Sequence, residues 1–117
     1  MSRSASEVVN AYDLVLWCHM RPELITEICA DPLVRRCIGK RVELSHEEQM
    51  ERVEAFRGRG LFFERVLQFS EGGFVTWVWN CSNAQDSEIF SGIEIFRVVD
   101  GRITEVWNSP YGDELWG

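Results

Sequence analysis

A single carboxylate on an otherwise apolar strand face is the feature of this sequence most able to do chemistry. Residues 88–99 alternate with the period of a β-strand. One face of that strand carries Phe90, Gly92, Glu94, Phe96 and Val98. A buried charge is costly unless it is paired or neutralised. Glu94 is therefore predicted either to pair with an arginine, such as Arg36 or Arg65, or to serve a site as a neutral acid with a raised pKa.

Two tryptophans on the preceding segment offer flat surface to the same site. In residues 74–82, one side of the expected strand carries Val75, Trp77, Trp79 and Cys81. If that side faces the same interior as Glu94, the two indoles suit a flat, largely apolar ligand, with Cys81 and Phe96 beside them. The alternative is that these indoles are ordinary core or interface residues.

The composition excludes several classes of function. A chain of 117 residues is expected to form one domain, residues 1–117, around one core. A formal net charge of −7 argues against nucleic acid as a partner, because phosphate binding needs a basic surface. The basic residues between positions 35 and 41 are expected to form a solvated edge. No apolar run reaches the roughly 18 residues of a membrane span, so no membrane partner is expected.

The four cysteines lack the spacing of a metal site. Cys18, Cys29, Cys37 and Cys81 include no Cys-x-x-Cys pair and no histidine at ligand spacing, so no metal is predicted. The first apolar run has no cleavage site of a signal peptide. Reduced thiols and a cytoplasmic location are the simpler interpretation.

The first half of the chain is expected to be helical. Capping boxes begin two helices at Ser4 and Ser45, the first running to about Cys18 and the second ended by Gly58. In the first helix, Tyr12 falls on the inward stripe, where its hydroxyl either reaches a ligand or is satisfied locally.

Between these helices the pattern is weaker. A shorter helix is predicted from Pro22 until Asp31-Pro32 stops it. Residues 34–45 are then expected to form a short extended or irregular connection. This connection carries the basic residues between positions 35 and 41.

The second half changes to the period of strands. Four strands are predicted over residues 61–69, 74–82, 88–99 and 102–109. Short connections join them, including the tight turn Asp100-Gly101 and the loop 83–87, so the strands should form an antiparallel meander. Helices followed by a meander indicate an α+β fold in which the helices cover one face of a curved sheet.

The other face of that sheet predicts a homodimer. Ile89, Ile93 and Ile95 alternate away from Glu94, and Ile103 and Trp107 are expected to join them. That apolar area exceeds what a monomer usually exposes, which favours a dimer formed through the sheet. The alternative is that the C-terminal residues 110–117 fold over it.

Residues 92–108, Gly-Ile-Glu-Ile-Phe-Arg-Val-Val-Asp-Gly-Arg-Ile-Thr-Glu-Val-Trp-Asn, resemble the SnoaL-like branch of the nuclear transport factor two-like superfamily. The opening segment, Val8 to Leu16, is similar to the first helix of ketosteroid isomerase, a member of that superfamily. The resemblance implies a cone-shaped α+β barrel. Its curved, mostly antiparallel sheet would have the N-terminal helices on its concave face and a ligand pocket inside. Isomerases, polyketide cyclases, dehydratases and non-catalytic binders share this cone.

The resemblance also implies site residues. Tyr12 falls where ketosteroid isomerase has its oxyanion-hole tyrosine, and Glu94 where it has a protonated aspartic acid. The position of that enzyme's base falls on Arg36, which would bind a carboxylate or enolate if it faces the pocket. Many SnoaL-like chains have acid/base residues on either side of the last strand's tryptophan. Here those two positions hold Val106 and Asn108. Of these two, only Asn108 can orient a ligand oxygen.

Two functions are consistent with these observations. The first is an isomerase, cyclase or dehydratase that uses no cofactor and acts on a ketone-bearing ring compound. The second is a non-catalytic module that binds a small hydrophobic metabolite, and the empty acid/base positions favour it. The retention of Tyr12 and Glu94 favours the enzyme.

Overall fold

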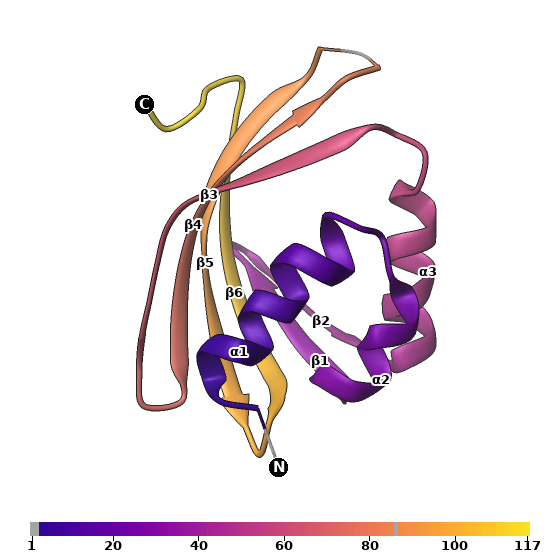
Figure 1. The fold of residues 1–117 in the computed structure, drawn as a ribbon, viewed down its shortest axis with the longest axis vertical. Coiled ribbons are helices and arrows are strands. Elements are labelled where there is room, and N and C mark those ends of the chain that lie inside the picture. The colour runs from indigo at the N-terminus through magenta and orange to yellow at the C-terminus, as the bar shows by residue number, and fades with distance from the viewer. Residues whose placement is uncertain (1–2, 86) are drawn as a thin grey trace.

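A computed structural model of the protein describes residues 3–85 and 87–117 and shows a curved sheet with helices packed on its concave side (Figure 1). The described residues form six strands in the order β2-β1-β6-β5-β4-β3. All neighbouring strands are antiparallel except β1 and β6, which are parallel. The predicted α+β cone with a mostly antiparallel sheet is confirmed.

The first helix lies across the concave face. α1 (Ala5–Asn10) continues without a break into η1 (Ala11–Trp17), where the backbone hydrogen bonds have π-helical spacing. Ser4 caps it as predicted: its side chain accepts from the N–H of Glu7, and the Glu7 carboxylate accepts from the N–H of Ser4. The predicted extent of this helix is confirmed.

The other helices cover one end of the sheet. A 3₁₀ turn, η2 (Pro22–Leu24), leads into α2 (Ile25–Ile28), and α3 (His46–Phe56) begins at the predicted capping box on Ser45. The short helix therefore ends at Ile28. The prediction that Asp31-Pro32 ends it is wrong.

The segment after α2 was expected to be extended or irregular, and it is extended: it forms a β-hairpin. β1 (Cys29–Cys37) pairs with β2 (Lys40–Leu44), and β1 also joins the main sheet beside β6. Pro32 lies within β1, at the point where pairing with β6 is interrupted between Cys29 and Val34. A proline usually demotes a run to an edge strand or to no strand. The place of β1 in the main sheet was missed because its partner there, β6, lies at the far end of the chain.

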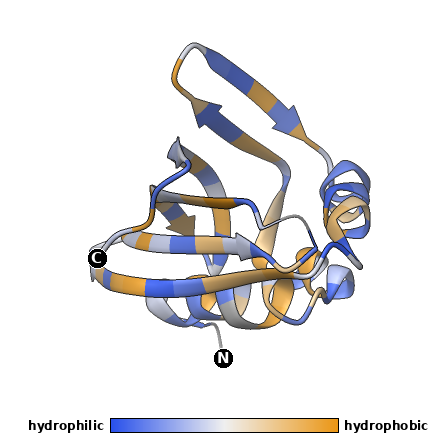
Figure 2. Cartoon of the chain, turned by 90° about the horizontal axis from the view of Figure 1, so that it is seen from above, coloured by the Kyte–Doolittle hydropathy of each residue, from blue (hydrophilic) through white to orange (hydrophobic). Residues whose placement is uncertain are grey.

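The predicted meander is confirmed. Its strands are β3 (Leu61–Glu71), β4 (Phe74–Asn83), β5 (Ile89–Val99) and β6 (Arg102–Gly112). Asp100 and Gly101 have φ angles of 52° and 77°, the left-handed values that a tight hairpin turn needs. Hydrophobic and hydrophilic positions alternate along the strands in Figure 2. Position 86 of the predicted loop 83–87 lies outside the described residues.

The concave face of the sheet and the helices enclose the core. On β5, Glu94 and Phe96 are buried, whereas Ile93 and Ile95 on the other face are more than a third exposed. Ile103 was expected on that outer face, but it is fully buried. An irregularity in the pairing of β5 with β6 after Arg97 shifts the alternation and turns Ile103 inward.

The C-terminal segment covers part of the outer face. The backbone N–H of Trp116 donates to Asn80 Oδ1 at 2.8 Å, and Asn80 Nδ2 donates to the carbonyl of Trp116 at 3.1 Å. The Trp116 indole N–H also donates to the carbonyl of Gly92 at 3.4 Å. This segment buries Asn80 but leaves Ile93 and Ile95 exposed, so the dimer remains a prediction.

The structure also bears on the cysteines, on membrane-spanning helices and on metal sites. All four cysteines are free thiols, and Cys29 and Cys81 are buried. Over the residues that the structure describes, none of the helices has both the length and the apolar character that crossing a membrane requires. Within the same residues, no three His, Cys, Asp or Glu side chains are placed to hold a metal ion.

Candidate functional site

A mainly aromatic cavity of about 130 Å³ lies between the concave face of the sheet and the helices. It is lined by Tyr12, Trp17, Arg35, Arg52, Phe56, Leu61, Phe63, Trp77, Trp79, Phe90, Glu94 and Asn108. An apolar cavity of roughly 150 Å³ holds one benzene ring. The cavity thus suits a ligand whose buried part is about one ring.

The register of the sheet places three cavity residues in one row. Asn108 on β6 lies directly opposite Glu94 on β5, and Glu94 lies opposite Trp77 on β4. Neighbours on one face of an antiparallel pair are close enough to interact. The row therefore sets a carboxylate between an amide and an indole.

Glu94 forms a buried ion pair with Arg35. Arg35 Nη2 donates to Glu94 Oε2 at 3.1 Å, and Arg35 Nη1 donates to the Tyr12 hydroxyl at 3.0 Å. The side chains of Arg35 and Glu94 are only 11% and 7% exposed. An arginine partner for Glu94 was one of the two expected outcomes, but the arginines considered were Arg36 and Arg65. The basic residues were expected to be solvated, and for Arg35 that expectation is wrong.

Burial dominates the electrostatics of these groups. Burial raises the pKa of Glu94 above the ordinary carboxyl value, and Arg35 acts in the opposite direction. Burial likewise raises the pKa of Tyr12, so its hydroxyl keeps its proton. Because Arg35 donates to the Tyr12 oxygen, the Tyr12 proton remains available to another acceptor.

A second guanidinium lies at the cavity wall. Arg52, on α3, sits over the ring of Trp17 at 5.8 Å from its centroid. It makes no ion pair or hydrogen bond with the described residues. Burial lowers the pKa of Arg52, and the nearby charge of Arg35 lowers it further.

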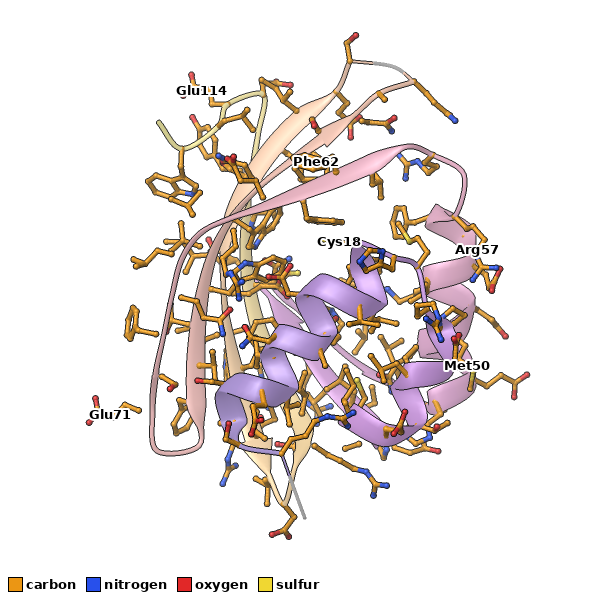
Figure 3. All side chains as sticks on the ribbon, in the orientation of Figure 1. Cys18, Met50, Arg57, Phe62, Glu71 and Glu114 are labelled. Carbon is orange, nitrogen blue, oxygen red and sulfur yellow. The ribbon has the colours of Figure 1, made fainter. Side chains whose placement is uncertain are left out.

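Several buried polar atoms at or near the cavity have no hydrogen-bond partner among the described residues. They are the indole nitrogens of Trp77 and Trp79, Asn108 Oδ1 and Asp13 Oδ2. Buried polar groups are normally hydrogen-bonded, so each orphan calls for an explanation such as a bound water or ligand. Figure 3 shows side chains of the sheet and the helices pointing into the space between them. Cys18, directly after η1, lies beside β3, where its thiol donates to the carbonyl of Phe63.

The chain can be compared with known protein families, curated proteins and solved structures. No protein-family sequence model matches the chain, and no curated protein matches it in sequence. Solved structures do match it along almost its whole length. The protein has the nuclear transport factor two-like fold.

Three of these structures illustrate the likeness. A candidate polyketide cyclase from Acidithiobacillus ferrooxidans is 19% identical, with a TM-score of 0.77 over 94% of this chain and 89% of its own. A candidate ketosteroid isomerase from Kribbella flavida is 13% identical, with a TM-score of 0.78 over 97% and 80%. A nuclear transport factor two-like protein of unknown function from Mesorhizobium loti is 22% identical, with a TM-score of 0.78 over 92% and 91%. Likeness at this level of sequence identity establishes the fold alone. The function has to be inferred from the residues of the site.

The cone brings together most of the residues singled out from the sequence. Those that line its cavity are Tyr12, Trp77, Trp79, Glu94 and Asn108. Those that are buried in the adjoining core without lining the cavity are Cys81, Phe96 and Val106. These last three pack behind the cavity wall and are not among its lining residues.

Arg36 lies on the outer face of the cone. Its guanidinium pairs with the Glu105 carboxylate and sits 5.4 Å from the ring centroid of Trp107. Side chains alternate across a strand, so Arg35 and Arg36 must face opposite sides of β1. Of the two orientations considered for Arg36, the structure shows the outward one, and Arg35 occupies the inward position.

Two basic residues that line the cavity were not predicted from the sequence to do so. Arg35 follows the buried Leu33 at a spacing of two, the strand period, but β1 was not recognised as a strand. Arg52 lies beside the inward stripe of α3 at Gln49, Val53 and Phe56. An arginine next to a helical stripe usually reaches solvent, so the sequence alone carries little signal for it.

Gly92 provides a test of how the cavity wall is packed. A Cβ at this position would lie 2.8 Å from Trp79 Cε2, and closer still to Trp79 Cζ2. Gly92→Ala is expected to lower the free energy of unfolding by about 1–3 kcal/mol, because the indole must move. Urea denaturation measures the change. Gly112→Ala is the control, because no atom lies within 4 Å of its added Cβ, and equal losses in the two variants would refute the close packing.

Proposed function

We propose that the cavity binds a small, flat ring compound that carries a ketone, and that the protein acts on it as a cofactor-independent isomerase, cyclase or dehydratase. The observation that supports this proposal is the hydrogen-bonded set of Tyr12, Arg35 and Glu94 in the wall of an otherwise aromatic cavity. Aromatic walls with a few convergent polar groups are typical of ligand sites.

Tyr12 and Arg35 are suited to stabilise negative charge on the ligand's oxygen. The Tyr12 hydroxyl accepts from Arg35 and keeps its own proton to donate. When a proton leaves the carbon beside a ketone, charge develops on the ketone oxygen. A fixed donor backed by a buried cation favours that charge most in the transition state.

Glu94 is suited to be the base. Its pairing with Arg35 through Oε2 favours the ionised carboxylate over the neutral acid that was the other alternative from the sequence. Its other oxygen, Oε1, makes no hydrogen bond with the described residues. Burial raises the pKa of Glu94, which makes the carboxylate a stronger base. The carboxylate would take the proton from carbon and return it to another atom of the ligand.

One observation favours a second candidate, a non-catalytic binding module. The ion pair with Arg35 already satisfies the buried charge of Glu94, so the pair stands without any catalytic role. Asn108, opposite Glu94, also has no proton to exchange near neutral pH.

A ligand titration with three variants separates these functions. Cyclic ketones and enones of one ring are titrated while tryptophan fluorescence is recorded. Saturable quenching is expected, and Trp79→Phe should weaken it, since Trp79 lines the cavity. For a ligand that is turned over, Glu94→Gln should lower kcat by at least about 100-fold, and Tyr12→Phe should also lower it, while both still bind. Binding without any turnover would support the module, and no binding of any ring would refute both functions.

We further propose that the protein is a cytoplasmic homodimer formed through the outer face of the sheet. Phe74, Ile93 and Ile95 are exposed there, and the rings of Phe74 and Trp107 are 6.4 Å apart. Sedimentation equilibrium should give twice the monomer mass. Ile95→Lys should yield monomers, whereas Val66→Lys on the edge strand β3 should not. A monomeric unmodified protein would refute the dimer.

A further inference from the structure

The charges around the cavity are unbalanced. Arg35 and Arg52 supply two positive charges, whereas Glu94 is the one carboxylate among the described lining residues. The guanidinium of Arg35 is engaged by Glu94 and Tyr12. Arg52 therefore makes no ion pair of its own with the described residues of the cavity wall, and it shares the single carboxylate of Glu94 only through a longer-range attraction.

Arg52 is in an environment where an unpaired charge is unfavourable. The residue is part-buried, and its guanidinium stacks on Trp17. Taking a charge out of water costs free energy that a partner must offset. The other buried carboxyl group near this end of the sheet, Asp13, faces Arg65 at 3.8 Å. No carboxylate of the described residues pairs with Arg52.

We propose that the natural ligand is a monocarboxylate built on a single flat ring, and that Arg52 binds its carboxylate. This inference rests on the ligand-binding function proposed above and specifies the class of ligand. A guanidinium matches a carboxylate in planar, two-point geometry. A bound carboxylate would bring the cavity to two cations and two anions.

The remaining polar atoms suggest what else the ring carries. The indole nitrogens of Trp77 and Trp79 are donors without a partner, and Asn108 Oδ1 is an acceptor without one. Unpartnered donors favour a ligand with an additional oxygen acceptor, and the amide oxygen favours a hydroxyl. A ring acid with a hydroxyl substituent satisfies both, because a hydroxyl donates and accepts, whereas an oxo group can only accept. The cavity volume of about 130 Å³ limits the buried part to about one ring.

The first experiment uses the unmodified protein. Benzoate, 3-hydroxybenzoate, benzamide and acetophenone are titrated by calorimetry at low ionic strength. Benzoate is expected to bind at least about tenfold more tightly than the isosteric, neutral benzamide, and 3-hydroxybenzoate more tightly again. Equal affinities for benzoate and benzamide would overturn the inference and leave ligand binding intact. Binding of none of the four would overturn the inference together with the proposed function.

A variant then tests the residue. Arg52→Gln should bring the benzoate affinity down to that of benzamide and leave the benzamide affinity unchanged. Arg59→Gln is the matched control, since Arg59 also stacks on an aromatic ring, 5.0 Å from the centroid of Phe56, but does not line the cavity. Arg52→Lys should keep part of the preference for benzoate. A full preference for benzoate in folded Arg52→Gln would overturn the assignment to Arg52.

Discussion

Arg35→Met is expected to lower the free energy of unfolding by about 3–5 kcal/mol, because it leaves the Glu94 carboxylate buried without its partner. The side chain of Glu94 is 7% exposed, and Arg35 is the one cation that forms an ion pair with it among the described residues. The substitution also removes the hydrogen bond to Tyr12. Urea denaturation at pH 7 measures the loss.

Two companion variants show whether the loss comes from the buried charge. Arg36→Met removes an adjacent arginine whose ion pair with Glu105 lies on the outer face, and it should cost no more than about 1 kcal/mol. In the double variant Arg35→Met/Glu94→Leu, the orphaned charge is gone, so at least about 2 kcal/mol should return. If the double variant were as unstable as Arg35→Met alone, the loss would belong to packing and not to charge.

The stability of Asp13→Asn relative to the unmodified protein is expected to rise as the pH rises from 4 to 7. Asp13 is 1% exposed, and burial raises the pKa of its carboxyl group from 3.8 to about 6, although Arg65 acts in the opposite direction. Between these two values the folded state holds a proton that the unfolded state has released. The free energy of unfolding of the unmodified protein therefore falls as the pH rises through this window, by up to about 3 kcal/mol.

The measurement is the difference between the two proteins at each pH. Asparagine does not titrate, so the stability of Asp13→Asn relative to the unmodified protein should rise by roughly 2–3 kcal/mol between pH 4 and pH 7. Val9→Ala is the control. It removes part of a fully buried side chain in the same helix, and its cost should not change with pH. A flat difference for Asp13→Asn would mean that the carboxyl group is not buried as described.

Both predictions concern side chains that set the polarity of the concave face. Arg35 and Glu94 belong to the cavity wall, whereas Asp13 faces Arg65. The charge of Glu94 also raises the pKa of Asp13. Loss of the Glu94 charge should consequently lower the apparent pKa of Asp13, which an NMR titration of the Asp13 carboxyl carbon in Glu94→Gln can follow.

Local signals in the sequence were sufficient for the helices and the meander. The Ser4 and Ser45 capping boxes, the Asp100-Gly101 turn and the alternation around Glu94 each depend on residues a few positions apart. Such signals act through short-range hydrogen bonds and backbone preferences, which a sequence displays directly. They predicted that Glu94 lies on the inner face, but left open whether Trp77 and Trp79 share that face as cavity residues or belong to the core or an interface.

Tertiary structure decided the partners of those residues. Whether Arg35 or Arg36 faces inward depends on the register of β1, because a shift of one residue exchanges the two faces of the strand. The parallel pairing with β6 sets that register. In this pairing Arg35 lies opposite Val106, about seventy residues along the chain. Ile103 turned inward for a similar reason, a local irregularity in the pairing of β5 with β6. Burial, the pairing of charges and the lack of an ion pair for Arg52 among the described residues all result from contacts between distant segments. No local pattern encodes the free energies of those contacts.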